Sequence, residues 1–226
     1  KNLFTYCAAA VIAASCCCKT SVAPAIPQDK EIEAKIEKIL KRMTLEEKVG
    51  QMTQITATAL ANGVELTPAG DSILRTYKIG SVLNTLADCA QTPEAFNNFI
   101  KEVNRISLEE TGIPTLYGLD HIHGTSYVLG GILFPQEINI AASFNREHAY
   151  NMGAVTAYES RAANVPWTFS PTMDLGRNPE WPRMWESFGE DTYLNAQMAV
   201  AEVKGMQGDV QNDGKHLYST VKHFAA

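Results

Sequence analysis

The sequence predicts an α/β protein that forms the N-terminal portion of a (β/α)8 TIM-type barrel. From residue 79 onward, segments composed like buried strands alternate with segments of helical periodicity. Such alternation is typical of a parallel sheet with crossover helices. Polar clusters stand at or just after the strand ends, where a parallel barrel assembles its functional loops. The 226 residues end on a predicted strand, short of the ~250 of a complete barrel, so we expect only its first part.

The composition indicates a globular protein and argues against two kinds of partner. Hydrophobic residues make up 45% of the chain and charged residues 19%, which is ordinary for a folded domain. The 19 Lys and Arg are outnumbered by 25 Asp and Glu, for a net charge of -6, and no basic tract occurs. We therefore expect no nucleic-acid partner. No apolar run reaches the ~18 residues of a membrane-spanning helix.

The first residues have the pattern of an export signal. A basic start is followed by a short apolar run and by small residues before Cys16, which is typical of a secretory signal peptide. The stretch before Cys16 resembles a bacterial lipobox, in which the cysteine becomes lipidated. We expect a signal peptide over 1–15 and a lipoprotein tether over 16–29, attached to the membrane only through a lipid anchor. A plain signal peptide followed by chance cysteines is the alternative.

The body of the chain opens with helices. Apolar residues at helical spacing predict an amphipathic helix over 30–43. Thr44 and Glu47 form a capping box that opens a second short helix through Met52. A buried strand is predicted over 79–86, and Pro93 stands at a favourable first-turn position for the helix that follows.

Strands and helices then alternate to the end of the chain. Thr115 to Leu119 reads as a strand, and 146–164 suits a helix. Val165 to Met173 is predicted to be the next strand. A helix over 190–207, opened by Asp191, and a strand from Tyr218 to Phe224 complete the pattern.

Four clusters at these strand ends carry residues capable of chemistry. They are GLDHIHG (118–124), FPQ (134–136) with AASFN (141–145), SPTMDLGRNPEWPR (170–183) with ESFGED (186–191), and TVKHF (220–224). Together with MTLEEKVGQM (43–52), they resemble the N-terminal domain of glycoside hydrolase family 3, the β-glucosidase and β-xylosidase type. The resemblance covers most of residues 40–226 in the family's order. It implies a partial barrel domain of this family over 30–226.

The resemblance implies a set of sugar-binding residues, and their chemistry suits that role. In the family, the positions matching Asp120, Arg177, Lys222 and His223 bind the terminal non-reducing sugar. A carboxylate such as that of Asp120 can accept hydrogen bonds from two adjacent hydroxyls. Arg177 offers a rigid fork of donors, and the other two side chains add further donors. Each residue alone also has a purely structural interpretation, as a cap, an ion-pair partner or a strand-end residue.

Lys222 and His223 are adjacent, and neighbours in a regular strand point to opposite faces. In the family, the matching peptide bond is typically cis, which turns both side chains toward the sugar. We therefore expect distorted backbone at this step.

Other residues near the clusters have structural interpretations. For Arg183 we favour an ion pair with Glu186, Glu190 or Asp191. Trp167, Trp181 and Trp185 offer either a stacking wall or core packing.

Three loop residues have roles that the sequence does not separate. They either shape the cleft or brace its loops: Gln136, His123 and Asn145. Asp174 and Glu190 match no catalytic position of the family, so we assign neither a catalytic role.

His121 and His123 raise the alternative of a metal site. Two histidines one residue apart at a strand end can bind a metal, but such a site needs further histidine or carboxylate ligands. The only other histidines are His148, His216 and His223, and the first two show no ligand-like pattern. We therefore expect neither a metal site nor a cofactor.

The resemblance implies a retaining, exo-acting β-glycosidase, most simply a β-glucosidase that hydrolyses terminal β-D-glucosyl residues. Its substrate is expected to be a β-linked oligosaccharide or an aryl glucoside. Family members use a carboxylate nucleophile and a second carboxyl as acid and base, and both are expected beyond Ala226. The chain then needs the missing C-terminal part of the same protein, and alone it is expected to be inactive. A non-catalytic sugar-binding lipoprotein is the alternative. Either form is expected to be exported, as a periplasmic or outer-membrane lipoprotein of a bacterium.

Overall fold

The computed structural model describes residues 28–209 and 213–223. The predicted signal peptide (1–15), Cys16 and most of the predicted tether lie outside these residues. The chain divides into two compact units, Lys1–Met43 and Thr44–Ala226. None of the helices in the described ranges is long and apolar enough to cross a membrane.

The first unit contains helix α2 (Lys30–Arg42), which confirms the helix predicted over 30–43. Asp29 caps it, because its Oδ1 accepts hydrogen bonds from the backbone nitrogens of Glu31 at 2.8 Å and Ile32 at 3.2 Å. Acidic residues lie in its first turn and basic residues in its last. Both placements stabilise the helix, because acidic side chains lie at the positive end of its dipole and basic side chains at the negative end.

The second unit is built on a parallel sheet of five strands. The strands are β1 (Gln54–Thr56), β4 (Ser81–Leu83), β5 (Leu116–Leu119), β6 (Trp167–Thr168) and β7 (Tyr218–Ser219). They lie side by side in the order in which they follow along the chain, β1-β4-β5-β6-β7, and every neighbouring pair is parallel. This is the arrangement of consecutive strands in a parallel barrel.

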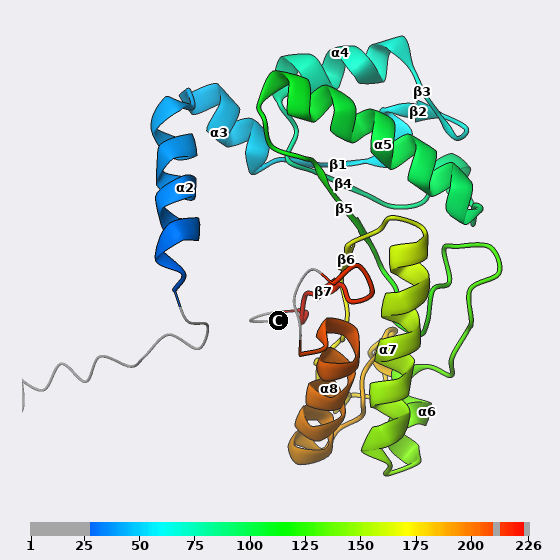
Figure 1. Ribbon diagram of the computed structural model, residues 1–226. Coiled ribbons are helices and arrows are strands. Elements are labelled where there is room, and N and C mark those ends of the chain that lie inside the picture. Colours follow the sequence, from blue (N-terminus) through cyan, green and yellow to red (C-terminus); the bar gives the residue numbers. More distant parts are fainter. Residues whose placement is uncertain (1–27, 210–212, 224–226) are drawn as a thin grey trace, which may run out of the picture. The chain divides into compact units, whose positions relative to one another are not determined.

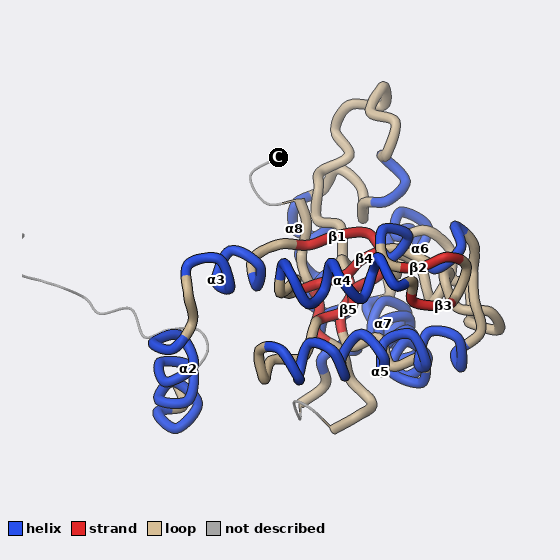
Figure 2. Tube along the Cα trace, turned by 90° about the horizontal axis from the view of Figure 1, so that it is seen from above, coloured by secondary structure: helices blue, strands red, loops and turns tan. Residues whose placement is uncertain are grey.

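Helices connect the strands (Figure 1). They are α3 (Leu45–Gln51), α4 (Pro68–Tyr77), α5 (Pro93–Glu110), α6 (Glu137–Ala142), α7 (Arg146–Ala162) and α8 (Thr192–Gln207), with single 3₁₀ turns at Ala57–Ala59, Leu86–Asp88 and Met184–Glu186. Helices α4 and α5 pack together beside β1 and β4, while α7 and α8 lie side by side (Figures 1 and 2). A small antiparallel hairpin of β2 (Ala61–Asn62) and β3 (Glu65–Leu66) follows β1.

The main core lies between α5 and the first strands. Phe96, Phe99 and Ile106 of α5 are buried, as is Tyr117 of β5. The Tyr117 ring meets both phenylalanine rings edge-on, at centroid distances of 6.0 and 6.3 Å. Burial of each such side chain stabilises the fold by about 1.5–3 kcal/mol. The apolar stripe therefore fixes α5 against the sheet.

Three predicted strands are longer than the observed ones. The segment 79–86 forms a ladder only at β4, because Asn84 adopts a left-handed conformation, φ 71°, and leaves the strand. The segments 165–173 and 218–224 form ladders only at β6 and β7. Pro171 has no amide hydrogen to donate to a ladder, and beyond it one bridge, Thr172 to Lys222, joins the described parts of the two segments. Phe224 lies outside the described residues.

The capping predictions are confirmed. The Thr44 side chain accepts from the Glu47 backbone nitrogen, and the Glu47 carboxylate accepts from the Thr44 nitrogen, so the capping box opens α3. Pro93 is in the first turn of α5. Asp191 caps α8 by accepting from the Leu194 nitrogen at 2.7 Å. Strand β1, the hairpin, α4 and α6 are elements that the sequence analysis did not identify.

Candidate functional site

The predicted sugar-binding residues lie at one edge of the sheet. Asp120 directly follows β5, Arg177 lies in the segment after β6, and Lys222 and His223 follow β7. Since these strands are parallel, their carboxyl ends share an edge. Gly118 of β5 gives the rings behind this edge room to pack, because a Cβ there would lie 2.5 Å from Cζ of Phe169.

Lys222 forms an ion pair with Asp120. The Nζ atom of Lys222 donates to Oδ1 of Asp120 at 2.6 Å. The two side chains are 12% and 29% exposed, so this ion pair is partly shielded and solvent screens it less than a fully exposed pair. Two residues that are 102 positions apart in the chain therefore meet, as the prediction of a shared site requires.

His223 contacts a different carboxylate, that of Asp174. Its Nδ1 lies 2.7 Å from Oδ2 of Asp174, whose side chain is 14% exposed. The backbone oxygen of Asp174 in turn accepts from Nδ2 of Asn195 on α8 at 3.2 Å. The peptide bond between Lys222 and His223 is cis, which confirms the distorted backbone expected there.

A pocket of about 640 Å³ lies at this edge. Its lining residues are Met173, Asp174, Leu175, Arg177, Trp181, Arg183 and His223. Arg177 and His223 therefore line one cavity, whereas Asp120 and Lys222 are not among its lining residues. A hollow with two arginines, a carboxylate, an imidazole and an indole suits a ligand that is neutral, ring-shaped and rich in hydroxyls.

Arg183 has the structural partner that we favoured. Its Nε and Nη2 donate to the two carboxylate oxygens of Glu186 at 2.9 and 2.6 Å. This bidentate pair joins the residue that precedes the 3₁₀ turn Met184–Glu186 to the last residue of that turn. Hydrogen bonding to Glu186 also raises the pKa of Arg183.

The three tryptophans have different environments. Trp181 lines the pocket. Trp167 packs edge-on against Phe169 at 4.7 Å, and its Nε1 donates to Oγ1 of Thr220 at 2.7 Å. Trp185 is half exposed. Only Trp181 therefore offers a ring to the pocket.

Two of the three loop residues left undecided by the sequence, His123 and Asn145, have bracing contacts. His123 Nδ1 lies 3.0 Å from the Phe134 carbonyl oxygen. Asn145 caps α7 by accepting from the Glu147 nitrogen at 3.0 Å. The Gln136 side-chain oxygen is buried and has no hydrogen-bond partner in the described structure.

His121 points into the protein interior. It is fully buried, and neither ring nitrogen has a hydrogen-bond partner among the described residues. Burial lowers the pKa of His121 to about 3, so this imidazole is neutral at physiological pH. Over residues 28–209 and 213–223, no three histidine, cysteine or acidic side chains are grouped so as to hold a metal ion.

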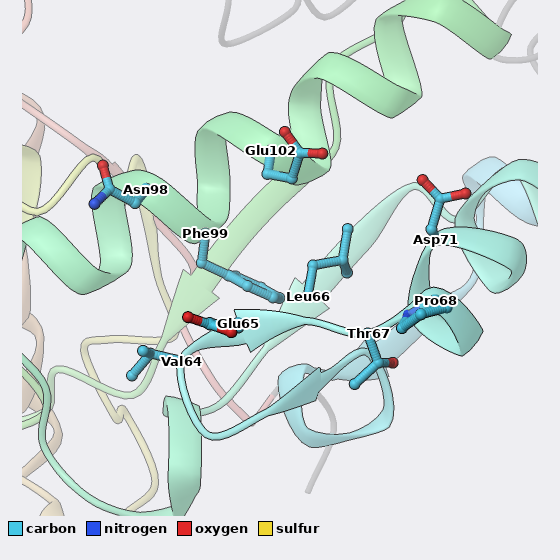
Figure 3. Close-up of a pocket in the computed structure, with 9 residues that line it drawn as sticks. All are labelled: Val64, Glu65, Leu66, Thr67, Pro68, Asp71, Asn98, Phe99 and Glu102. Atoms are coloured by element: carbon cyan, nitrogen blue, oxygen red, sulfur yellow. The ribbon is translucent and has the colours of Figure 1, made fainter.

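A second pocket, of about 550 Å³, lies between the β2–β3 hairpin, the start of α4 and the helix α5 (Figure 3). Phe99 and Leu66 point into it, while Glu102 and Asp71 stand at its rim (Figure 3). Asp71 is paired with Arg75, and Glu102 with Arg105. None of the predicted sugar-binding residues lines this pocket.

The sequence matches a known domain family over the whole of the second unit. Residues 44–226 match the glycosyl hydrolase family 3 N terminal domain. The chain therefore belongs to this family, and the predicted fold class, the N-terminal portion of a (β/α)8 TIM-type barrel, is confirmed.

Two proteins named as beta-glucosidases match most of the chain. It is 34% identical over 206 residues to the lysosomal beta glucosidase of Dictyostelium discoideum, a match that covers 84% of this chain and 25% of the relative. It is 32% identical over 203 residues to the periplasmic beta-glucosidase of Salmonella typhimurium, covering 90% and 24%. The chain thus spans about a quarter of the length of these relatives.

Solved structures show the same fold. An exo-1,3/1,4-beta-glucanase from a Pseudoalteromonas species superposes with a TM-score of 0.78 at 34% identity, over 88% of this chain and 25% of that one. A beta-glucosidase from Listeria innocua, solved in complex with isofagomine, gives a TM-score of 0.68 at 30% identity, over 87% and 26%.

Proposed function

We propose that this chain supplies part of the sugar-binding site of a retaining, exo-acting β-glucosidase. The observation that carries the proposal is that the four residues converge at one edge of the sheet. Lys222 forms an ion pair with Asp120, and His223 lines the same pocket as Arg177. In this assignment, Asp120, Arg177, Lys222 and His223 bind the terminal non-reducing glucosyl residue. The names of the relatives, beta-glucosidases and an exo-beta-glucanase, support the same chemistry.

The geometry suits hydroxyl recognition. Oδ1 of Asp120 accepts from Lys222, which leaves Oδ2 to accept from a sugar hydroxyl and the remaining ammonium hydrogens to donate to another. Because Nδ1 of His223 is bonded to Asp174, Nε2 is the ring nitrogen available to a ligand. Arg177, which lines the same pocket as His223, adds further donors.

Cleavage itself requires groups outside the proposed sugar-binding set. Retaining glycosidases use one carboxylate as nucleophile and one carboxyl as acid and base, separated by ~5 Å. We assign both to a C-terminal part of the same protein, beyond Ala226. Asp174, which is engaged with His223, fills neither role. The substrate is a β-linked oligosaccharide or an aryl glucoside.

The leader adds a location to this proposal. The periplasmic name of the Salmonella relative supports export, and the small residues before Cys16 support a lipid anchor at that cysteine. Mass spectrometry of the protein made in a bacterium tests the anchor. We expect an acylated Cys16 at the mature N-terminus, and an unmodified Cys16 would refute the anchor without affecting the sugar site.

Hydrolysis of p-nitrophenyl β-D-glucoside tests the activity. We expect release of p-nitrophenol by the protein with its C-terminal part, and none by residues 1–226 alone. Asp120→Asn should reduce kcat/KM by about 10²-fold or more, as expected when a charged hydrogen-bonding group is lost from a binding site. Glu65→Gln, in the second pocket, serves as control and should have the same kcat/KM as the unaltered protein. Glucose binding without hydrolysis would instead support a sugar-binding lipoprotein.

A further inference from the structure

Two buried carboxyl groups lie behind the segment that carries the site. Glu137, the first residue of α6, and Glu202, on α8, are both fully buried. Each has one carboxyl oxygen with no hydrogen-bond partner in the described parts of the chain. Burial is costly for a carboxyl group unless its surroundings use it. Nothing in the proposed sugar chemistry accounts for either side chain.

Each carboxyl group binds the segment between β6 and the pocket. Oε1 of Glu137 accepts from the backbone nitrogen of Thr172 at 3.1 Å. Oε1 of Glu202 accepts from Oγ of Ser170 at 3.0 Å. The two groups thus hold positions 170 and 172, on either side of Pro171. This short segment has helices α6 and α8 as its support.

On its opposite side, the segment around Pro171 is hydrogen-bonded to the backbone of Lys222. The Lys222 nitrogen donates to the Pro171 oxygen at 3.1 Å, and the Met173 nitrogen donates to the Lys222 oxygen at 2.7 Å. In a parallel bridge of this pattern, the intervening residue Thr172 directs its own N–H away from Lys222. A neighbouring strand would normally accept that hydrogen bond. Here the Glu137 carboxyl group takes the place of that strand.

We propose that Glu137 is a positioning residue for Lys222. Its carboxyl group satisfies the outward N–H of Thr172, fixes the 171–173 backbone, and so places Lys222 Nζ on Asp120. The proposal rests on the proposed function for the sugar-binding role of Lys222, although the placement of Lys222 on Asp120 is tested independently of sugar.

The electrostatics agree with this arrangement. Burial and the nearby Glu202 raise the pKa of Glu137, while the Thr172 N–H and the Lys222 charge act in the opposite direction. Burial likewise raises the pKa of Glu202. A neutral carboxyl group still has an oxygen that accepts from Thr172. The positioning role therefore needs an acceptor at this place rather than a negative charge.

This reasoning distinguishes two substitutions. Glu137→Gln keeps an amide oxygen that can accept from Thr172, whereas Glu137→Met has a similar length and no acceptor. Glu159 offers a matched control, because its Oε2 accepts from the Ile132 nitrogen at 2.9 Å, on a loop away from Lys222. Glu159→Met likewise removes one hydrogen bond between a carboxyl group and a backbone nitrogen of the same unit, an exposed one where that of Glu137 is buried.

The direct measurement is ¹⁵N NMR of the lysine ammonium groups in the full chain, with the Lys222 signal assigned by its loss in Lys222→Arg. An ammonium held on a shielded carboxylate exchanges slowly with water. We expect the Lys222 signal to persist in Glu137→Gln and Glu159→Met. In Glu137→Met its exchange should be about tenfold faster, the factor expected for losing one hydrogen bond. An unchanged Lys222 signal in folded Glu137→Met would overturn the proposal.

A second measurement applies even if Glu137→Met does not fold. In the unaltered chain, the Thr172 amide should exchange with solvent slowly, although it has no strand partner; rapid exchange would also refute the role of Glu137. Calorimetry with D-glucose, on the protein with its C-terminal part, separates the two proposals. If no variant binds glucose but the ammonium signals behave as expected, the proposed function fails and the positioning role stands. If Glu137→Met binds glucose normally and its Lys222 signal is unchanged, the positioning role fails and the proposed function stands.

Discussion

The buried imidazole of His121 predicts a specific acid sensitivity of the fold. His121 directly follows Asp120, lies in contact with the Tyr127 ring at a centroid distance of 5.9 Å, and is fully buried. Burial lowers its pKa from 6.5 to about 3. In the unfolded chain the imidazole takes up a proton near pH 6.5, whereas in the folded chain it stays neutral until about pH 3. The unfolded state therefore binds more protons in this range, and stability falls as the pH falls.

The size of the effect follows from the two pKa values. Between pH 7 and pH 5, the His121 contribution lowers the free energy of unfolding by about 2 kcal/mol. The loss continues to about pH 3, where it levels off because the folded imidazole also becomes protonated. At pH 7 and above, the contribution is nearly constant.

Urea unfolding at pH 7 and pH 5, followed by circular dichroism, measures this effect. The unaltered chain should lose about 2 kcal/mol more than His121→Leu over this interval, since the other titrating groups are common to both. Equal losses in the unaltered chain and in His121→Leu would show that His121 is not buried as a neutral group.

Three further predictions concern other parts of the second unit. Gly205→Ala should lower the free energy of unfolding by about 1–3 kcal/mol, because a Cβ there would lie 2.1 Å from the Tyr150 carbonyl oxygen; an unchanged urea midpoint would contradict the close packing of α7 and α8. Thr44→Ala removes the capping box and should cost about 1 kcal/mol in the same assay, a loss that Thr44→Ser should largely avoid. Asp174→Ala removes the anchor of His223 and should weaken D-glucose binding about tenfold by calorimetry, and undiminished affinity would argue against a binding role of His223.

Local signals predicted the long helices well. Helix α5 begins at Pro93 as expected, and its apolar stripe is the buried one. Such a stripe reports on its own element, because three to four apolar residues per two turns already specify a face and a period. The predicted helix over 146–164 matches α7 closely for a similar reason.

Strand lengths were overestimated because burial and ladder formation are different properties. Val165, Ser170 and Thr172 are buried, so the segment has the composition of an interior strand. Only Trp167–Thr168 has ladder partners on both sides. Composition reports the first property, whereas the second depends on neighbouring segments that are far away in the chain.

The elements missed between residues 54 and 77 are short or weakly patterned. β1 has three residues and each hairpin strand two, too few for an alternation to be recognised. Helix α4 did have a signal: Thr67 caps it by accepting from the Gly70 nitrogen at 2.9 Å, and Pro68 stands in its first turn. A cap followed by proline would have located this helix.

The candidate site shows the same division between local and long-range information. Family resemblance nominated Asp120 and Lys222 individually, but their contact joins residues 102 positions apart. Asp174 was set aside as a catalytic group, and the structure shows it bound to His223. No local pattern distinguishes a carboxylate that anchors another side chain from one that caps a turn.

These pairings have a consequence for how the proposed site would receive a sugar. Lys222 and His223 are each held by a carboxylate of the chain itself, so their head groups need not be ordered by the substrate, and less conformational entropy is lost on binding. The same pairings limit which atoms remain free: Oδ2 on Asp120, the outer hydrogens on Lys222, and Nε2 on His223. A hydroxyl that donates to Asp120 beside one that accepts from Lys222 would match this order of groups. Binding should therefore favour sugars with two adjacent free hydroxyls, and blocking either one by methylation should weaken it more than blocking a hydroxyl elsewhere on the ring.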